Sequence, residues 1–389
     1  MPATPLKNLI YLAALPVLSP SPKGQMRHAE QGEPLRFLQE YEALLVKHHV
    51  FGATLLLKDG QRQAIVHTST RKPEHTARPE TLYRVASITK MATALTALRL
   101  QDEGLLSLDA PVATLLPGGE ALGGITIRQL LSHTSGLRDT AAYAEALRQG
   151  ESWSWVVAQP GVLVGTPGAY FSYCNLGFGL IGCILEQVSG LPLDRLFDEK
   201  LFQPLGMTAT LDASRLNPAD VMPIVRVLPY RAGTEVAIPE LGRKPLGEPD
   251  SSRHFGHTAG AMYTNAPSLS RLLTLIIQQG EIDGRRLLST DVISAMTVLH
   301  GFSGPAQHPT RRYGLGLVLL ERPELSERRL LGHQGFAYGC VDGAFVEEGT
   351  GRQVIFLNGG SSEARTGKLG LVNRDILRWA LRREMPSWT

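Results

Sequence analysis

The sequence predicts a single α+β unit, an α/β sandwich whose antiparallel sheet is built from both ends of the chain. Runs with strand-like composition, separated by turn signals, occur over residues 34–86 and again over about residues 280–385. Apolar residues at helical spacing dominate about residues 87–280 between them. The simplest arrangement is a sheet flanked by helices, with a mostly helical region inserted.

Composition and charge exclude several classes of protein. The chain has 389 residues, of which 43% are hydrophobic and 19% charged, as in a globular protein with a large core. Its net charge of +3 is nearly neutral for this length, which argues against nucleic acid or an acidic membrane surface as a partner. Cys174, Cys183 and Cys340 provide neither a disulfide framework nor a tetrahedral metal set. The sequence contains no stretch of about twenty uncharged apolar residues, so no membrane span is expected.

Residues 1–33 are predicted to be an N-terminal extension or linker, before a single folded unit over residues 34–385. Leu9–Leu18 has the length of the apolar region of a signal peptide, but the residues after it offer no A-x-A-like cleavage site. Residues 19–33 are polar and rich in Pro, Ser, Gly and Gln, as in a linker. The sequence therefore favours a cytoplasmic location, with export to the periplasm or the cell exterior as the alternative.

The predicted elements follow the chain in order. Residues 34–49 have helical spacing, and the strand-like residues 51–58 and 63–67 flank Asp59-Gly60, so a helix and a tight β-hairpin are expected. Residues 217–255 lack a clear period and contain six prolines, which is typical of a functional or irregular loop. Further helices are expected over residues 91–103, 126–131, 176–188, 268–279 and 369–380, and a strand meander over residues 313–320, 328–331, 339–346 and 353–358.

Two motif matches have a simpler structural explanation. Gly177–Gly182 fits G-x-G-x-x-G, but the polar residues 172–175 before it make a poor buried strand, so the glycines are expected on a helix face. His254 and His257 are spaced H-x-x-H without the flanking carboxylate that zinc hydrolases use, so a solvated pair is expected and no metal. The sequence contains no G-x-S-x-G, which excludes the nucleophile elbow of α/β-hydrolases.

Ser87 and Lys90 are the first candidates for chemistry, because residues three apart lie on one side of a helix. A serine hydroxyl is a poor nucleophile at neutral pH, and a lysine kept neutral by desolvation can act as its base. The spacing alone is not specific, since the chain has a second copy at Ser69 and Lys72. That copy lies in a polar run with no apolar helix after it, so it is expected to be a solvated loop.

The surroundings favour the copy at Ser87. An apolar helical run begins at Met91, so Lys90 is expected to point into the protein. Ser87 is expected at the helix entrance, where a free backbone N–H and the helix dipole favour negative charge. An oxyanion hole requires this arrangement.

Two downstream motifs are candidates to complete the site. Tyr173 and Asn175 are two apart and can face the same way from an extended turn, and Tyr173 could accept a proton if a cation such as Lys90 lowered its pKa. The alternative is a tyrosine packed at a helix start. His333-Gln334-Gly335 follows a strand-like run. A glycine on an edge strand lets a substrate backbone approach closely, and the Phe336 N–H could be the second oxyanion donor. The alternative is an ordinary polar turn.

Taken together and in this order, the three motifs resemble those of the serine β-lactamase and penicillin-binding protein superfamily. The S-x-x-K, Y-x-N and K/H-x-G order and spacing are similar to the class C β-lactamase-like branch, which includes D-alanyl-D-alanine carboxypeptidases, D-aminopeptidases and β-lactamase-like esterases. The resemblance covers about residues 35–385. Further segments that resemble hallmarks of the family are Tyr83–Lys90, Ile125–Leu137, Gly168–Gly190, Leu201–Thr208 and Ala259–Leu273.

The resemblance implies a β-lactamase/transpeptidase-like fold and a serine hydrolase that works through an acyl-enzyme, without a cofactor or metal. Ser87 would be the acylated nucleophile, with Lys90 and Tyr173 sharing general-base and general-acid duty. The Ser87 and Phe336 N–H groups would form the oxyanion hole, and Gly335 would clear space for the substrate. The substrate-binding residues that the resemblance implies are Asn175, His333, Gly335 and Phe336.

His333 departs from the class C β-lactamases, which carry lysine at this position. Without a permanent positive charge, the expected grip on the carboxylate of a β-lactam or peptide is weaker. The resemblance therefore favours an esterase or a D-peptidase of carboxypeptidase or aminopeptidase type, acting on small esters or D-amino-acid peptides. A class C-type β-lactamase and a non-catalytic penicillin-recognising protein are the alternatives. The acyl group, the role of residues 217–255 and the oligomeric state are left open.

Overall fold

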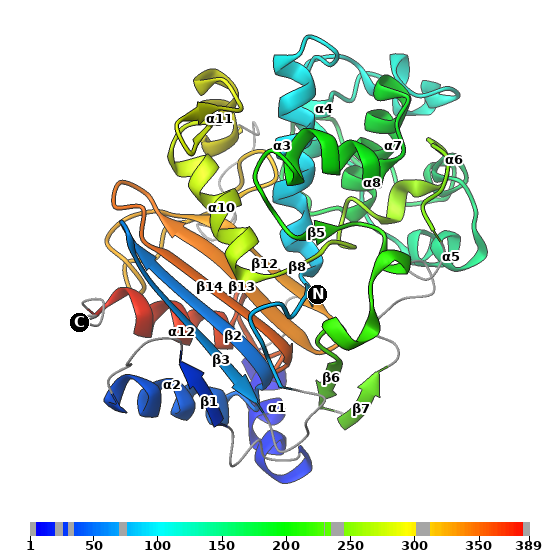
Figure 1. The fold of residues 1–389 in the computed structure, drawn as a ribbon. Helices are drawn as coiled ribbons and strands as arrows, with labels where there is room; N and C mark the ends of the chain where they lie inside the picture. The colour runs from blue at the N-terminus through cyan, green and yellow to red at the C-terminus, as the bar shows by residue number, and fades with distance from the viewer. Residues whose placement is uncertain are drawn as a thin grey trace.

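A seven-stranded antiparallel sheet forms the centre of the protein (Figure 1). The computed structural model describes residues 5–19, 26–29, 35–69, 76–228, 230–234, 245–300 and 312–383. The strand order is β1-β3-β2-β14-β13-β12-β11, so N-terminal and C-terminal strands share one sheet. The strands are β1 (Met26–Ala29), β2 (Phe51–Asp59), β3 (Arg62–Ser69), β11 (Val318–Leu320), β12 (Leu330–Ala337), β13 (Cys340–Glu347) and β14 (Gln353–Gly360).

The two ends of the chain meet where β2 pairs with β14. Leu55 lies opposite Phe356 and Leu57 opposite Val354 in this antiparallel register. β2 and β3 form the predicted hairpin, and Gly60 in its turn has a φ of +57°, which glycine adopts without strain. The predicted α+β fold, with one sheet built from both chain ends, is confirmed.

Side chains that alternate along the strands pack into two separate cores. Leu55 and Leu57 belong to a core beneath α2 and α12, whereas Leu56 points the other way and joins the larger core with α3 and α10. Figure 1 shows the sheet between these two helical layers. The covering helices are α2 (Leu35–Lys47) and α12 (Leu371–Leu381) on one face and α3 (Thr89–Asp102) and α10 (Ala266–Ile277) on the other.

Most of the remaining helices lie between β4 (Tyr83–Arg84) and α10 in the sequence. The predicted helix at residues 126–131 begins with a capping box, in which Thr126 and Gln129 bond to each other's backbone. The predicted helix at 176–188 is α7, which ends at Gly190 with a φ of +66°. The additional helices are α4 (Ile127–Leu131), α5 (Ala141–Gln149), α6 (Trp153–Val157), α7 (Asn175–Ser189), α8 (Leu193–Phe197) and α11 (Thr290–Thr297).

The glycines of the G-x-G-x-x-G match lie inside α7, as expected for a small-residue helix face. A Cβ on Gly179 would lie 2.0 Å from the Phe255 carbonyl oxygen, and a Cβ on Gly182 would lie 2.5 Å from Thr258 Oγ1. The glycines therefore let residues 255–258 pack directly against the helix backbone. This contact brings the chain segment after Phe255 next to α7.

Two stretches that were predicted to be irregular contain strands. Met26–Ala29, within the predicted linker over residues 19–33, forms β1 and pairs with β3 at the sheet edge. Within residues 217–255, β6 (Ile224–Val227) and β7 (Tyr230–Thr234) form a hairpin with a register shift between Ile224 and Arg226. Residue 229 and residues 235–244 lie outside the described part of the chain.

The last strands differ from the prediction at their ends. Only Val318–Leu320 of residues 313–320 forms a strand, β11. β12 does not stop near Leu331 but continues through His333-Gln334-Gly335 to Ala337. The alternative of an ordinary polar turn is therefore wrong, because the triplet pairs with β13 throughout, whereas the expected edge-strand glycine is found as Gly335 of β12.

The apolar segment near the N-terminus forms α1 (Pro5–Leu18), from which Leu15 packs against Phe51 and Val225. Across the described ranges, no single helix is long and apolar enough to cross a bilayer. Two consecutive segments, Asn175–Ser189 and Leu193–Phe202, are together long and apolar enough for a span, but the chain bends by 84° between them.

The close packing of α7 generates a stability prediction. Gly179→Ala places a methyl group onto a backbone oxygen that cannot rotate away, so we expect the free energy of unfolding to fall by about 1–3 kcal/mol. Gly177→Ala is the matched control, because its Cβ meets only ordinary contacts, at 3.6 Å from Leu130 Cδ2. Alanine in a helix interior should stabilise that variant by up to about 1 kcal/mol. Urea unfolding of both variants measures the difference, and equal effects would contradict this account of the packing.

Candidate active site

Ser87 lies in a short 3₁₀ turn, η2 (Ala86–Ile88), between β4 and α3. The preceding residue, Ala86, has a φ of +46°, a left-handed conformation that non-glycine residues rarely adopt. Thr89 Oγ1 donates to the Ala86 carbonyl (2.6 Å), which fixes this turn. In the first turn of a helix, the Ser87 N–H has no intrahelical acceptor. The predicted position at a helix entrance is therefore the observed one.

Lys90 is fully buried on α3, and its amine lies in a cage of acceptors and rings. Nζ lies 2.6 Å from the Ala259 carbonyl oxygen, 2.8 Å from Asn175 Oδ1 and 3.4 Å from Ser87 Oγ. It also lies 4.9 Å from the centroid of the Tyr173 ring. Burial lowers the pKa of Lys90 to about 7, although the nearby Asp139 charge opposes the shift.

These contacts orient the lone pair of the amine. A neutral amine has two N–H groups and one lone pair. The Ala259 carbonyl and Asn175 Oδ1 can only accept hydrogen bonds, so they take the two N–H groups. The lone pair is left facing Ser87 Oγ. With a pKa of about 7, a large fraction of Lys90 is in this neutral form at neutral pH.

The hydroxyl of Tyr173 donates to Ser87 Oγ at 2.8 Å, although 39% of the Tyr173 residue surface remains exposed. Burial around the hydroxyl raises the pKa of Tyr173, and the hydrogen bond to Ser87 offsets only part of that effect. The condition for Tyr173 to accept a proton, a lowered pKa, is therefore not met. Tyr173 is placed to donate a hydrogen bond, with Ser87 Oγ between it and Lys90.

Asn175 is the first residue of α7, and Asp139 holds it there. Asp139 Oδ2 accepts from the Asn175 backbone N–H and from its Nδ2, both at 2.8 Å, and Oδ1 accepts from the Leu176 N–H at 3.0 Å. Cys174 occupies the N-cap position but its side chain does not cap the helix. The Asp139 carboxylate, distant in sequence, accepts the first N–H groups of the helix instead. Because Nδ2 is bound to Asp139, Oδ1 of the Asn175 amide is turned towards Lys90.

His133 supports Tyr173 from behind. Its ring lies 4.3 Å from the Tyr173 ring and 4.7 Å from the Tyr313 ring. The Cys174 N–H donates to His133 Nδ1 (3.2 Å), so the ring proton is on Nε2. Burial, together with the charge of Lys90, holds the pKa of His133 well below its usual value, and the ring is neutral.

His333 is a buried, neutral residue on β12. Its Nδ1 lies 2.6 Å from the Gln334 carbonyl, which can only accept, so Nδ1 carries the proton. Nε2 then accepts from the Tyr313 hydroxyl at 2.9 Å. Burial and the charge of Lys90 lower the pKa of His333 to about 3. As expected, position 333 carries no positive charge. The centroids of the His333 and Tyr173 rings are 6.4 Å apart.

The edge of β12 beyond Gly332 is open on the side of η2. β11 pairs only as far as Gly332, so residues 333–337 have no strand neighbour on that side within the described sheet. Ala337 and Cys340 close a two-residue turn, which makes them a hydrogen-bonded pair. Hydrogen-bonded and open pairs alternate, so the Phe336 N–H points away from β13, towards the open edge.

Gly335, which the resemblance implies clears space for a substrate, makes room in the structure for the segment that carries Ser87. A Cβ at this position would lie 2.3 Å from the Val85 carbonyl oxygen and 3.2 Å from Ala86 Cβ. Any side chain at 335 would push β12 and η2 apart. The glycine therefore sets the spacing between the Ser87 and Phe336 N–H groups.

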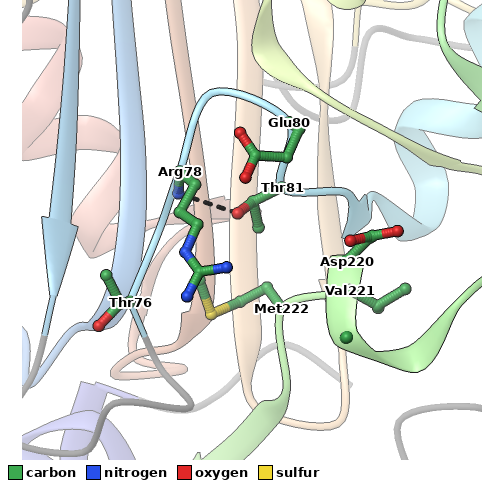
Figure 2. A pocket seen from close by; sticks show the side chains of 8 residues that line it. Thr76, Arg78, Glu80, Thr81, Asp220, Val221 and Met222 are labelled. Carbon is green, nitrogen blue, oxygen red and sulfur yellow. Dashed lines mark hydrogen bonds between the residues drawn. The ribbon is translucent and has the colours of Figure 1, made fainter.

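A cleft of about 410 Å³ opens beside these residues, with Ser87, Asn175 and Phe336 among those that line it. A smaller pocket of about 90 Å³ lies elsewhere, where Arg78 donates through its backbone to Thr81 Oγ1 (Figure 2). None of the predicted site residues lines this second pocket, and its lining contains no serine, cysteine or lysine.

His254 and His257 are not the solvated pair that the sequence predicted. His254 Nδ1 lies 2.8 Å from Oε1 of the buried Glu186, and His257 is itself buried. Within the described residues, no three or more His, Cys, Asp or Glu side chains are grouped to hold a metal ion.

The structure thus brings together the candidate residues of the three motifs, which are Ser87, Lys90, Tyr173, Asn175, His333, Gly335 and Phe336. The Gln334 side chain points elsewhere and bonds to Lys368 and Gly370. Three further residues were missed by sequence reasoning: Asp139, His133 and Tyr313. His133 lies in Ile125–Leu137, one of the segments that resemble hallmarks of the family, but its own spacing does not mark it. Nothing in the spacing of Asp139 or Tyr313 marks them.

Comparisons with known proteins identify the family of the chain. The family model described as Beta-lactamase matches residues 37–368. The Escherichia coli (strain K12) D-alanyl-D-alanine-carboxypeptidase/endopeptidase AmpH is 30% identical over 171 residues, which are 41% of this chain and 44% of that protein. The chain therefore matches less than half the length of this relative. The esterase EstB of Burkholderia gladioli is 29% identical over 336 residues, 77% of this chain and 83% of the esterase.

A solved structure extends the similarity of fold. The D-amino acid amidase from Ochrobactrum anthropi SV3, complexed with D-phenylalanine, superposes with a TM-score of 0.69 at 20% identity, over 90% of this chain and 98% of the amidase. At this identity the likeness concerns the fold. Since the family model matches most of the sequence, the chain belongs to the beta-lactamase family of serine hydrolases.

Proposed function

We propose that the protein hydrolyses small esters, or amides and peptides of D-amino acids, through an acyl-enzyme on Ser87. The observation that carries this proposal is the buried amine of Lys90, whose lone pair faces Ser87 Oγ and whose pKa is lowered to about 7. A serine becomes nucleophilic when such a base can take its proton. The likeness to the esterase EstB supports esters, and the shared fold with the D-amino acid amidase supports amides.

In the acylation step, neutral Lys90 takes the Ser87 proton while Oγ attacks the substrate carbonyl. The carbonyl oxygen becomes an oxyanion between the N–H groups of Ser87 and Phe336, both of which lack competing acceptors in the geometry described above. The bond to the leaving group then breaks. The proton held by Lys90 returns to the leaving group, directly or through the Tyr173 hydroxyl. Water repeats the sequence on the acyl-enzyme and releases Ser87.

The remaining residues position these groups. Asn175 accepts one N–H of Lys90 and borders the cleft, so it both orients the base and can meet a substrate amide. His333 keeps the Tyr313 hydroxyl in place beside Tyr173 without adding charge. A site without a cation at position 333 is poorly suited to the carboxylate of a β-lactam, which favours esters and D-amino-acid derivatives over β-lactamase activity.

The first prediction concerns the nucleophile. Ser87→Ala should lower kcat/KM for a short 4-nitrophenyl ester by about 10³-fold or more, because no other group in the cleft is activated for attack. A fluorophosphonate probe should label Ser87 in the unmodified protein, as peptide mapping would show. Ser69→Ala, which removes the serine of the second S-x-x-K copy, is the control and should behave as the unmodified protein. Labelling at Ser69, or full activity of Ser87→Ala, would disprove the proposal.

The second prediction concerns pH. Only the neutral form of Lys90 accepts a proton, and this form predominates above its pKa of about 7. For an ester that does not ionise, kcat/KM should therefore rise with pH through about 7 and reach a plateau above it. Because the pKa of Tyr173 is raised, Tyr173 adds no falling limb below its ordinary range. A profile that is flat, or that falls through pH 7, would exclude Lys90 as the base.

The third prediction separates a positioning role of Asp139 from a purely structural one. The Asp139 charge raises the pKa of Lys90, so Asp139→Asn should lower that pKa further and move the rising limb to lower pH. Loss of the charged cap of α7 should reduce kcat as well. Asp250→Asn is the control, because Asp250 caps the turn at Ser252 and Arg253 and makes no contact with Lys90. An unchanged midpoint in Asp139→Asn would show that Asp139 acts only on stability.

A further inference from the structure

The cleft beside Ser87 is positively charged. Arg84 on β4 and Arg226 on β6 both line it, and no aspartate or glutamate is among its described lining residues. The rest of the lining is largely apolar or aromatic and includes Tyr143, Leu147 and Tyr338. A cleft of this character suits a substrate with an apolar stem and an anionic group.

Arg84 is the less compensated of the two cations. Its Nε and Nη1 are buried, and neither has a hydrogen-bond partner among the described residues. Among the described residues no carboxylate forms an ion pair with it, and its Cζ lies 4.9 Å from the centroid of the Tyr338 ring. Buried donors without acceptors are costly, and the cost is recovered when a ligand supplies the acceptor.

Two further observations concern the neighbours of Arg84. Tyr338 is the first residue of the two-residue turn between β12 and β13, where its φ of +54° is the geometry that such a turn requires, and its ring lies at the guanidinium. Arg226 is partly neutralised, because its Nε lies 3.9 Å from Glu363 Oε2. Arg226 Nε likewise lacks a hydrogen-bond partner among the described residues, but Arg84 is the less neutralised of two positive charges in the same cleft.

The cleft receives the acyl half of the substrate. The leaving group must face the groups that return its proton, which are Lys90 and Tyr173. Neither of these lines the cleft, whereas Ser87 and Phe336–Tyr338 do. The half that stays bonded to Ser87 consequently extends past the Phe336 N–H towards Arg84.

We propose that the preferred acyl group carries a carboxylate, which Arg84 binds with charge-assisted hydrogen bonds over the Tyr338 ring. This inference rests on the proposed acyl transfer to Ser87 and specifies its substrate class. Half-esters of dicarboxylic acids and acyl groups with an acidic side chain fit the cleft. Acyl groups that carry a cation are disfavoured, because the cleft lining includes two arginines and no described carboxylate.

The first test uses the unmodified protein and three esters with the same chain length and leaving group. The probes are mono-4-nitrophenyl adipate (anionic), methyl 4-nitrophenyl adipate (neutral) and 4-nitrophenyl 6-(trimethylammonio)hexanoate (cationic), each corrected for spontaneous hydrolysis. We expect kcat/KM to be about tenfold or more higher for the anionic than for the neutral ester, and lowest for the cationic ester. Because Arg84 is only partly buried, the anionic preference should shrink as salt is added.

The second test uses variants of arginine. Arg84→Met keeps an apolar stem and should lower the anionic-to-neutral ratio of kcat/KM about tenfold, chiefly through KM. Arg84→Lys keeps the positive charge but lacks the planar set of N–H donors of a guanidinium, so it should retain part of the preference for the anionic ester. Arg148→Met is the matched control, because Arg148 is an exposed residue next to Leu147 on α5 and does not line the cleft. This control should leave the ratio unchanged.

The outcomes separate this inference from the proposed function. If none of the three esters is hydrolysed, the proposed function fails and this inference fails with it. If the neutral ester is hydrolysed without an anionic preference, the inference alone is overturned. It is also overturned if the preference persists in Arg84→Met or is lost equally in Arg148→Met. Should Arg84→Met not fold, Arg84→Lys and the salt dependence of the unmodified protein decide the question.

Discussion

The burial of one amine is the constraint on which the rest of the site depends. Lys90 can be uncharged near neutral pH only because α3, α7 and the segment at Ala259 exclude water around it. The same burial costs stability. Between pH 7 and the ordinary pKa of lysine, the unfolded chain binds a proton that the folded chain does not, so folding stability rises with pH across that window. At neutral pH the protein therefore tolerates a destabilising group, which the large core around it offsets.

Much of the fold follows from patterns in the sequence. The hairpin at Asp59 and the helices α2, α3, α4, α7, α10 and α12 were predictable because alternation and helical spacing record which face is buried. The shorter helices α5, α6, α8 and α11 were not predicted. β12 was predictable only in part, since Gly332, His333 and Gly335 have low strand propensity and are held in the sheet by register with β13. Prolines likewise concealed β6 and β7, whose pairing involves only a few residues.

The site was predictable as far as its local motifs reach. Ser87 with Lys90, and Tyr173 with Asn175, are neighbours in sequence, so their spacing carries information about their geometry. Asp139 lies 36 residues before Asn175, and their hydrogen bonds depend on how two loops fold together. The sequence also could not show that Lys90 is placed to accept the proton and Tyr173 to donate one. This assignment depends on which hydroxyl and which amine are desolvated, and burial is a property of the tertiary structure.

The turn at Tyr338 and Gly339 imposes a parity rule on this hairpin. A slip of one residue between β12 and β13 would turn the Phe336 N–H from the open edge into the sheet and would reverse every side chain of β12. The register that this turn sets is therefore a requirement for two donors at one oxyanion. The β6–β7 hairpin pairs outside the central sheet, yet it contributes Arg226 to the cleft. Insertions or deletions in the β6–β7 hairpin can therefore change the lining of the cleft, and with it the range of substrates, without changing the register between β12 and β13.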